Sequence, residues 1–305
     1  MLLRRLIAAA LLGAVALGVR GQDAFDLTAP ARGVYVHLGR PVALDAPGHD
    51  DIANIGFIVG ERCVAVIDTG GSPRTGRRLR AAIREHTALP ICYVINTHVH
   101  VDHLLGNTAF REDRPSFVGH SALPGAISRS RDFFLKEYAG DLDAPASEDQ
   151  IIGPERLVEK ELMLDLGHRP IRLHAWPEAH TDCDLTVYDE RTATLWTGDL
   201  LFRQRLPALD GSIKGWLAVI DGLPRGARLA VPGHGEVTSD LAAALGSERA
   251  YLQSLLEGVR RELADGKSMQ DAMAHVGTDE KSHWLLFDQV HARNVARAYE
   301  ELQWE

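Results

Sequence analysis

The chain has 305 residues, which is enough for one large α/β domain or two small ones. Its 45% hydrophobic and 25% charged residues are typical of an ordinary globular protein. The 42 acidic residues outnumber the 33 basic ones and leave a net charge of −9. The sequence therefore lacks the basic surplus with which nucleic-acid-binding proteins meet phosphates, and we expect no nucleic-acid partner.

Residues 1–21 have the three parts of a secretory signal peptide. A short basic start at residues 1–5 precedes an apolar run at residues 6–18, which is too short to span a bilayer comfortably. Small residues near Gly18 and Gly21 offer cleavage sites. We expect a periplasmic or secreted protein without a stable membrane anchor after cleavage; an uncleaved anchor is the alternative.

The chain contains three cysteines, Cys63, Cys92 and Cys183. An odd number in an exported protein leaves at least one of them unpaired within the chain. Cys63 and Cys92 each begin an apolar strand and can be neighbours, but we expect buried free thiols rather than a strained bridge. Stability should then not depend on disulfides.

The first part of the mature chain predicts strands at 33–39, 54–59 and 62–67, the last two forming a hairpin around Gly60 and Glu61. Ser72 is a good N-cap and Pro73 a good first-turn residue, so a helix is expected through about residue 86. The strand at 91–96 follows, and this strand–helix–strand order predicts a parallel pair.

The later part alternates strands and turns before becoming helical. Helices are predicted at 121–138 and 212–223, and short strands at 117–120, 162–165, 171–174, 185–188, 194–196 and 229–231. From about residue 239 the pattern is helical to the end, with breaks near Gly266 and Gly277. Because no repeat or low-complexity linker interrupts the sequence, we expect residues 22–305 to form one domain with a helical C-terminal segment at about 239–305.

The segment 97–103 places four potential metal ligands in six residues, with the spacing H-x-H-x-D-H. It lies between a buried strand and a predicted helix. Side chains two residues apart on an extended backbone point the same way, so His98 and His100 can bind one ion. The turn that follows directs the side chains of Asp102 and His103 to a neighbouring position, where they can bind a second ion. Imidazole with carboxylate suits zinc, and less exclusively iron or manganese.

Later strands also end in ligand-type residues. His180 follows the strand at 171–174, Asp199 follows the strand at 194–196, and His234 follows the last predicted strand. Gly233 and Gly235 flank His234 and let the backbone approach a site closely. Because open α/β sheets place their chemistry at the carboxyl ends of strands, these residues are expected to meet the 97–103 segment.

These segments resemble the metallo-β-lactamase superfamily of hydrolases, through V-I-D-T-G, T-H-V-H-V-D-H, A-H-T-D-C-D, W-T-G-D and P-G-H-G in that order. The resemblance implies an α/β fold, a four-layer αββα sandwich with a two-metal site between its sheets. It implies that one metal is held by His98, His100 and His180, and the other by Asp102, His103 and His234. Asp199 would bridge both metals with a hydroxide between them, and Asp68 would support the ligands from outside.

The chain is similar, more narrowly, to the exported quinoprotein-relay zinc metallohydrolases, through A-H-T-D-C-D-L, D-G-S-I-K-G-W and H-A-R-N-V-A-R-A-Y-E-E-L. That subgroup accompanies quinone-cofactor dehydrogenases in the periplasm. The resemblance implies a quinoprotein dehydrogenase system as an associated partner, and it identifies no substrate.

Two positions depart from the best-known members of the superfamily. Asp199 stands where the most familiar zinc β-lactamases have a cysteine ligand; this resembles the glyoxalase II and lactonase types and lowers the expectation of strong antibiotic hydrolysis. Cys183 stands where many relatives have glycine, and we expect a supporting thiol or a loop residue there rather than a ligand. Lys214 can either hold a substrate carboxylate or be a solvated lysine at a helix start.

The expected function is that of a dinuclear zinc hydrolase acting on a small-molecule substrate. A metal-bridging hydroxide would attack the carbonyl of an ester, thioester, lactone or lactam, with Asp102 and Asp199 as the catalytic carboxylates. One alternative is a mononuclear iron persulfide dioxygenase, which the same ligands can support. Another is a non-catalytic, metal-binding accessory of a quinoprotein dehydrogenase.

Overall fold

The computed structural model describes residues 25–305, so the predicted signal peptide at 1–21 lies outside the described residues. The strands form two sheets. The seven-stranded sheet has the order β1 to β7, with β1 Thr28–Ala31, β2 Val34–His37, β3 Ile55–Val59, β4 Val64–Ile67, β5 Ile91–Ile95, β6 Ser116–His120 and β7 Arg156–Val158. The five-stranded sheet has the order β12-β11-β10-β9-β8, with β8 Glu161–Asp165, β9 Pro170–Ala175, β10 Leu185–Asp189, β11 Thr194–Phe202 and β12 Leu229–His234.

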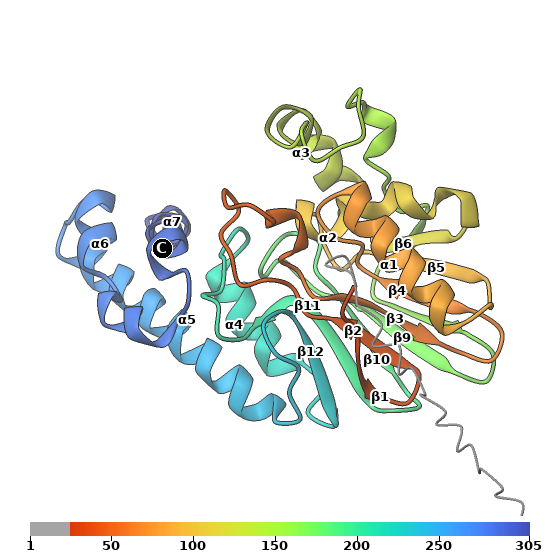
Figure 1. The fold of residues 1–305 in the computed structure, drawn as a ribbon. Coiled ribbons are helices and arrows are strands. Elements are labelled where there is room, and N and C mark those ends of the chain that lie inside the picture. The colour runs from red at the N-terminus through yellow and green to blue at the C-terminus, as the bar shows by residue number, and fades with distance from the viewer. Residues whose placement is uncertain (1–24) are drawn as a thin grey trace, which may run out of the picture.

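Helices lie on both sides of the paired sheets (Figure 1). The α-helices are α1 Pro73–His86, α2 Val101–Leu104, α3 Leu123–Glu137, α4 Ile213–Gly222, α5 Leu241–Ala264, α6 Met269–His275 and α7 Phe287–Leu302. The longest 3₁₀ helix, η2, spans Leu105–Asp113. No helix within residues 25–305 has both the length and the apolar character needed to cross a bilayer.

Alternation of side chains along the strands builds the layers. Phe57 of β3 packs in a core cluster with Leu79 of α1, whereas the next residue, Ile58, packs in a second cluster between the two sheets. On the other sheet, Trp196 of β11 joins the cluster between the sheets and Leu195 joins an outer cluster with α4 and α5. The order helix, sheet, sheet, helix confirms the predicted four-layer αββα sandwich.

The local predictions hold over most of the chain. The side chain of Ser72 accepts a hydrogen bond from the amide of Thr75, and α1 begins at Pro73. β4 and β5, on either side of α1, pair in parallel, which confirms the predicted crossover. The sequence did not predict β1 and β7, because these short edge strands carry exposed side chains and no clear apolar alternation.

The prediction of free thiols at Cys63 and Cys92 is wrong. The two residues form a disulfide with Cα atoms 5.8 Å apart, which is within the ordinary range for such a bond. They become neighbours because β4 and β5 pair with Val64 opposite Ile91, one residue from each cysteine. Cys183 is free and buried.

A buried ion pair ties the two sheets together. Arg169, immediately before β9, forms a bidentate pair with Asp189 of β10 at 3.0 and 2.6 Å, and both side chains are almost fully buried. Its guanidinium also donates to the carbonyl oxygen of Val59 in the other sheet at 2.7 Å and to that of Arg32 at 3.0 Å. All of these contacts depend on the positive charge and planar shape of one side chain.

We predict that Arg169→Ala lowers the free energy of unfolding by about 3–5 kcal/mol, because it leaves the Asp189 carboxylate buried without its counter-ion. Urea denaturation measures this change. Arg172→Ala is the matched control, since Arg172 is partly exposed and pairs with Glu190 on the surface; it should cost no more than about 1 kcal/mol. Equal losses in the two variants would contradict a bridging role for Arg169.

Candidate metal centre

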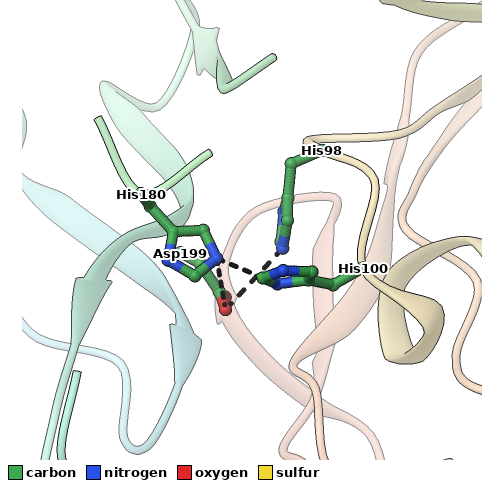
Figure 2. A group of neighbouring side chains, drawn as sticks. All are labelled: His98, His100, His180 and Asp199. Carbon is green, nitrogen blue, oxygen red and sulfur yellow. Dashed lines mark hydrogen bonds and ion pairs between the residues drawn. The ribbon is translucent and has the colours of Figure 1, made fainter. Parts of the chain in front are cut away.

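The structure brings all seven predicted ligands together at one edge of the sandwich. They form two adjoining groups in which the potential ligand atoms lie within 4.8 Å of one another: His98, His100, His180 and Asp199, and Asp102, His103 and His234. Figure 2 shows the first group, with its imidazoles and carboxylate turned toward a common centre.

Strand direction explains this convergence. β5 ends at Ile95 and leads into His98, His100 and the short helix α2. In the other sheet, β9 and β11 run the same way because each is antiparallel to β10, and β12 is parallel to β11. The carboxyl-terminal parts of these strands therefore deliver His180, Asp199 and His234 to one place.

Asp199 lies at the centre of the cluster. Its carboxylate oxygens are 3.2 Å from Nε2 of His103, 3.3 Å from Nε2 of His234 and 3.4 Å from Nε2 of His180. The backbone of Gly233 passes so close that a Cβ there would lie 1.8 Å from Oδ1 of Asp199. Only glycine leaves room for that carboxylate, as the sequence suggested for this position.

Each histidine has one ring nitrogen anchored and the other turned into the cluster. The anchors are Oγ1 of Thr97 for His98 (3.0 Å), Oδ2 of Asp210 for His100 (2.7 Å), Oδ2 of Asp68 for His103 (2.8 Å), the carbonyl of Ala208 for His180 (2.6 Å) and the carbonyl of Ile52 for His234 (2.8 Å). Such anchors fix the tautomer and the ring orientation of a metal-binding histidine.

Asp68 has the position predicted for a supporting residue. It follows β4 in a left-handed conformation with φ 53°, which is unusual for a residue with a side chain. Its carboxylate accepts hydrogen bonds from the amide and hydroxyl of Thr97, both at 2.8 Å, and from Nδ1 of His103. The strained backbone is held by three hydrogen bonds and in turn orients a ligand.

Sequence reasoning missed Asp210. This residue accepts a hydrogen bond from Nε2 of His100 and forms an ion pair with Arg293 of α7. It begins the segment D-G-S-I-K-G-W, which was noted for the resemblance, yet only the folded loop shows that it reaches His100. Through Arg293, the C-terminal helices contact the metal centre.

Nε2 of His98 is buried without a hydrogen-bond partner, and Nε2 of His103 and Oδ1 of Asp199 contact each other at 3.2 Å without hydrogen-bond geometry. A buried polar atom costs folding free energy unless it has a hydrogen-bond partner. These three atoms belong to the two groups of potential ligand atoms that gather at the cluster. Nitrogen and carboxylate donors in this arrangement fit divalent metal ions of the zinc type.

The electrostatics of the cluster also favour metal binding. Burial lowers the pKa of His98 well below its usual value, and that of His180 to about 4, so both imidazoles are neutral at physiological pH. Burial also lowers the pKa of His103, but the negative charges of Asp199, Asp102 and Asp68 raise it by more, so the pKa of His103 lies well above its usual value. A metal would have to displace the proton on this nitrogen, so its affinity should increase with pH.

Several cavities border the cluster, and two of them share part of their lining. One, of about 150 Å³, is lined by His100, Asp102, Asp199 and His234, together with Leu44, Val101, Phe133, Phe134, Tyr138, Phe202, Arg205, Ala208, Asp210 and Arg293. The other, of about 380 Å³, shares His100, Phe133, Phe134, Asp210 and Arg293 with the first. A substrate in these cavities would contact metal ligands, aromatic rings and cations.

Two sequence candidates lie away from these cavities. The amine of Lys214 is half exposed at the start of α4 and pairs with Glu305 at 2.8 Å, so the structure favours the solvated-lysine alternative. Cys183 is buried in an apolar cluster with Val99 and Val101, and its sulfur belongs to neither ligand group. Cys183 therefore supports the ligand loop by packing.

We predict that Asp68→Ala weakens zinc binding by about 10- to 100-fold, because His103 loses the carboxylate that orients it. Competition with a chromophoric chelator measures the affinity. Asp143→Ala, at a surface residue paired with Arg77, is the control and should leave the affinity unchanged. If Asp68→Ala bound zinc as tightly as wild type, Asp68 would have no supporting role in the metal site.

Solved structures share this fold. A metallo-beta-lactamase from Pontibacter korlensis matches with a TM-score of 0.61 and 18% identity, over 75% of this chain and 98% of that chain. The DIM-1 metallo-beta-lactamase matches with a TM-score of 0.58 and 16% identity, over 75% and 96%. The sec-alkylsulfatase Pisa1 from Pseudomonas sp. matches with a TM-score of 0.69 and 17% identity, over 90% of this chain and 50% of that chain.

At these identities the structural matches show the fold alone. A search of curated proteins finds no match. A family model described as "Metallo-beta-lactamase superfamily", however, matches residues 49–255, a range that includes all seven clustered ligands. The chain therefore belongs to the metallo-beta-lactamase superfamily.

Proposed function

We propose that the protein is a dinuclear zinc hydrolase that cleaves an ester, thioester, lactone or lactam. The observation that carries this proposal is the convergence of five histidines and two aspartates, with unpartnered buried atoms aimed at their common centre. His98, His100 and His180 would hold one ion, and Asp102, His103 and His234 the other. Asp199 adjoins both groups and would contact both ions.

The residues of the chain prepare this site for hydrolysis. When bound, a pair of zinc ions would lower the pKa of a shared water and polarise a substrate carbonyl. Asp102 and Asp199 supply negative charge that offsets that of the cations. Phe133, Phe134 and Phe202 form the aromatic part of the cavity wall beside these carboxylates.

A covalent route through cysteine has no support. Cys183 is fully buried, and burial raises the pKa of its thiol, so the reactive thiolate does not form at neutral pH. Cys63 and Cys92 are joined in a disulfide. The proposed nucleophile is therefore water, which the carboxylates at the cluster are able to orient.

We predict that the zinc-loaded protein hydrolyses at least one thioester, lactone or carboxylic ester of a substrate panel, with β-lactams poor substrates; turnover of only the phosphodiesters or alkyl sulfates in that panel would contradict the proposed substrate class. Chelation should abolish turnover and zinc should restore it. His100→Ala and Asp199→Ala should lose metal and activity together, because each removes a ligand of the first group. His283→Ala, at an exposed histidine, is the matched control and should retain both.

Other outcomes of the same experiment would identify the alternatives. Iron in the native preparation, with oxygen consumed in the presence of a persulfide, would replace the hydrolase by a dioxygenase. A zinc-loaded protein that turned over no substrate would favour the accessory role. Full turnover in metal-free Asp199→Ala would contradict both metal-dependent reactions.

We also propose that the protein is exported and works beside a quinoprotein dehydrogenase system. The basic and apolar start of the sequence supports export, and so does the disulfide between Cys63 and Cys92, since structural disulfides persist in oxidising compartments. The association rests on the resemblance of three segments alone, so a dehydrogenase partner has to be sought by co-purification.

We predict that the native protein is recovered from the periplasm or medium without its first residues, and that denatured protein shows one titratable thiol per chain. Peptide mass spectrometry of the non-reduced protein should link Cys63 to Cys92. Three free thiols in a cytoplasmic fraction would contradict the proposed export.

A further inference from the structure

Each of the two sheets within residues 25–305 has two edge strands, and three of these four edges are protected against pairing with another chain. β1 contains Pro30 and has an irregular register with β2. β7 has only three residues. On β12, Ala230 exchanges backbone hydrogen bonds with Thr238, and Asn54 donates to the carbonyl of Pro232. Proline, irregular register, short length and cover by another segment are the usual means of blocking an edge strand.

β8, the remaining edge strand, has none of these protections. It pairs with β9 in a regular antiparallel register over all five of its residues. The hydrogen bonds at either end of β8 show that its even-numbered residues bond β9, so the N–H and C=O groups of Glu161, Met163 and Asp165 point away from the sheet. Among residues 25–305, the backbone groups of Glu161 and Met163 have no hydrogen-bond partner, and the carbonyl of Asp165 accepts one from Arg62.

The side chains of the same three residues lie on the outer face of β8. Leu162 and Leu164 alternate with them and pack toward the layer between the sheets. Met163 is 52% exposed, and Glu161 and Asp165 are exposed on either side of it. An exposed apolar residue between two carboxylates therefore lies beside a row of free backbone groups.

The two carboxylates are only partly neutralised by their neighbours. Glu161 lies 3.2 Å from Nδ1 of His174 and 3.8 Å from Arg172, and Asp165 lies 3.8 Å from Arg62. More than half of each acidic side chain is still exposed to solvent. A further cation beside the strand can therefore reach both carboxylates.

These charges determine which strand can pair with β8. A second copy of the chain, paired antiparallel along the whole strand, would place Glu161 of each copy opposite Asp165 of the other. Like charges directly opposite each other in a sheet destabilise the pair. The net charge of −9 also opposes the approach of a second copy. A strand with cations at these two positions would instead gain two favourable pairs.

We propose that β8 binds an extended segment of a protein partner as an added strand, with the pattern basic-x-apolar-x-basic. The apolar residue lies opposite Met163, and the basic residues lie opposite Glu161 and Asp165. The free backbone groups supply affinity for any strand, whereas the three side chains select its sequence. None of the residues lining the two cavities that share His100 belongs to β8, so this interaction is independent of the proposed hydrolysis.

Peptide binding tests the proposal. The peptide T-K-T-V-T-K-T, with an N-terminal fluorophore, is titrated into the full chain, and fluorescence polarisation measures its Kd. We expect saturable binding, and about tenfold weaker binding of T-E-T-V-T-E-T, because both favourable pairs become repulsive. N-methylation of the valine, whose amide would bond the carbonyl of Met163, should weaken binding by about tenfold. N-methylation of the threonine before the valine is the matched control and should change Kd by less than about threefold, because that amide points away from β8.

Variants of the chain locate the binding site. Met163→Pro removes an outward-facing N–H without breaking a bond to β9, so the variant should fold and bind the lysine peptide at least about tenfold more weakly. Glu161→Lys should weaken the same peptide by about fivefold and strengthen binding of the glutamate peptide. Glu85→Lys, at an exposed residue of α1, is the matched control and should leave both affinities unchanged. Hydrogen exchange should slow at residues 160–166 when the lysine peptide is bound.

The same measurements can overturn the proposal. Absence of saturable binding, or equal binding of the lysine and glutamate peptides, would leave the two carboxylates as a device that only prevents pairing. If Met163→Pro melted below wild type, the comparison of Glu161→Lys with Glu85→Lys would still decide the question. A wild-type dimer in sedimentation velocity that Met163→Pro dissociated would assign this edge to a second copy and refute the basic partner.

Discussion

The candidate metal centre depends on one physical constraint: every potential ligand imidazole has to be fixed through one nitrogen while its other nitrogen faces the centre of the cluster. Five anchors meet this requirement, and they come from distant parts of the chain, from the carbonyl of Ile52 to the carboxylate of Asp210. Asp68 adds rigidity, since its unusual backbone conformation is held by Thr97 and His103. These hydrogen bonds fix the orientation of the imidazole rings, which lowers the cost of binding a metal.

The sandwich provides the rigidity that these anchors need. The apolar layer between the sheets and the hydrogen bond from Arg169 to the carbonyl of Val59 fix one sheet relative to the other, and each sheet contributes part of the cluster. The C-terminal segment contributes as well, because Asn294 of α7 bonds the amide of Leu209 and the carbonyl of Pro207 on the loop that carries Ala208. Asn294 is therefore linked to His180 through the backbone of this loop and the hydrogen bond that His180 donates to the carbonyl of Ala208.

Much of the fold and the ligand set could be predicted from sequence because both depend on local patterns. Strand alternation, the Ser72 cap and the H-x-H-x-D-H spacing are local, and the resemblance placed His180, Asp199 and His234 beside them. The contacts that could not be predicted join residues far apart in the chain. Asp210 reaches His100 across a loop, Cys63 meets Cys92 through strand register, and Lys214 pairs with the C-terminal Glu305.

The central claim is that the two ligand groups bind two metal ions that share Asp199. Anomalous diffraction from crystals of the zinc-loaded protein tests it most directly, because the method places each zinc ion independently of the protein atoms. The account predicts two peaks, one among His98, His100 and His180 and one among Asp102, His103 and His234, with Asp199 in contact with both. Crystals without a peak at these residues, or with zinc bound elsewhere, would contradict it.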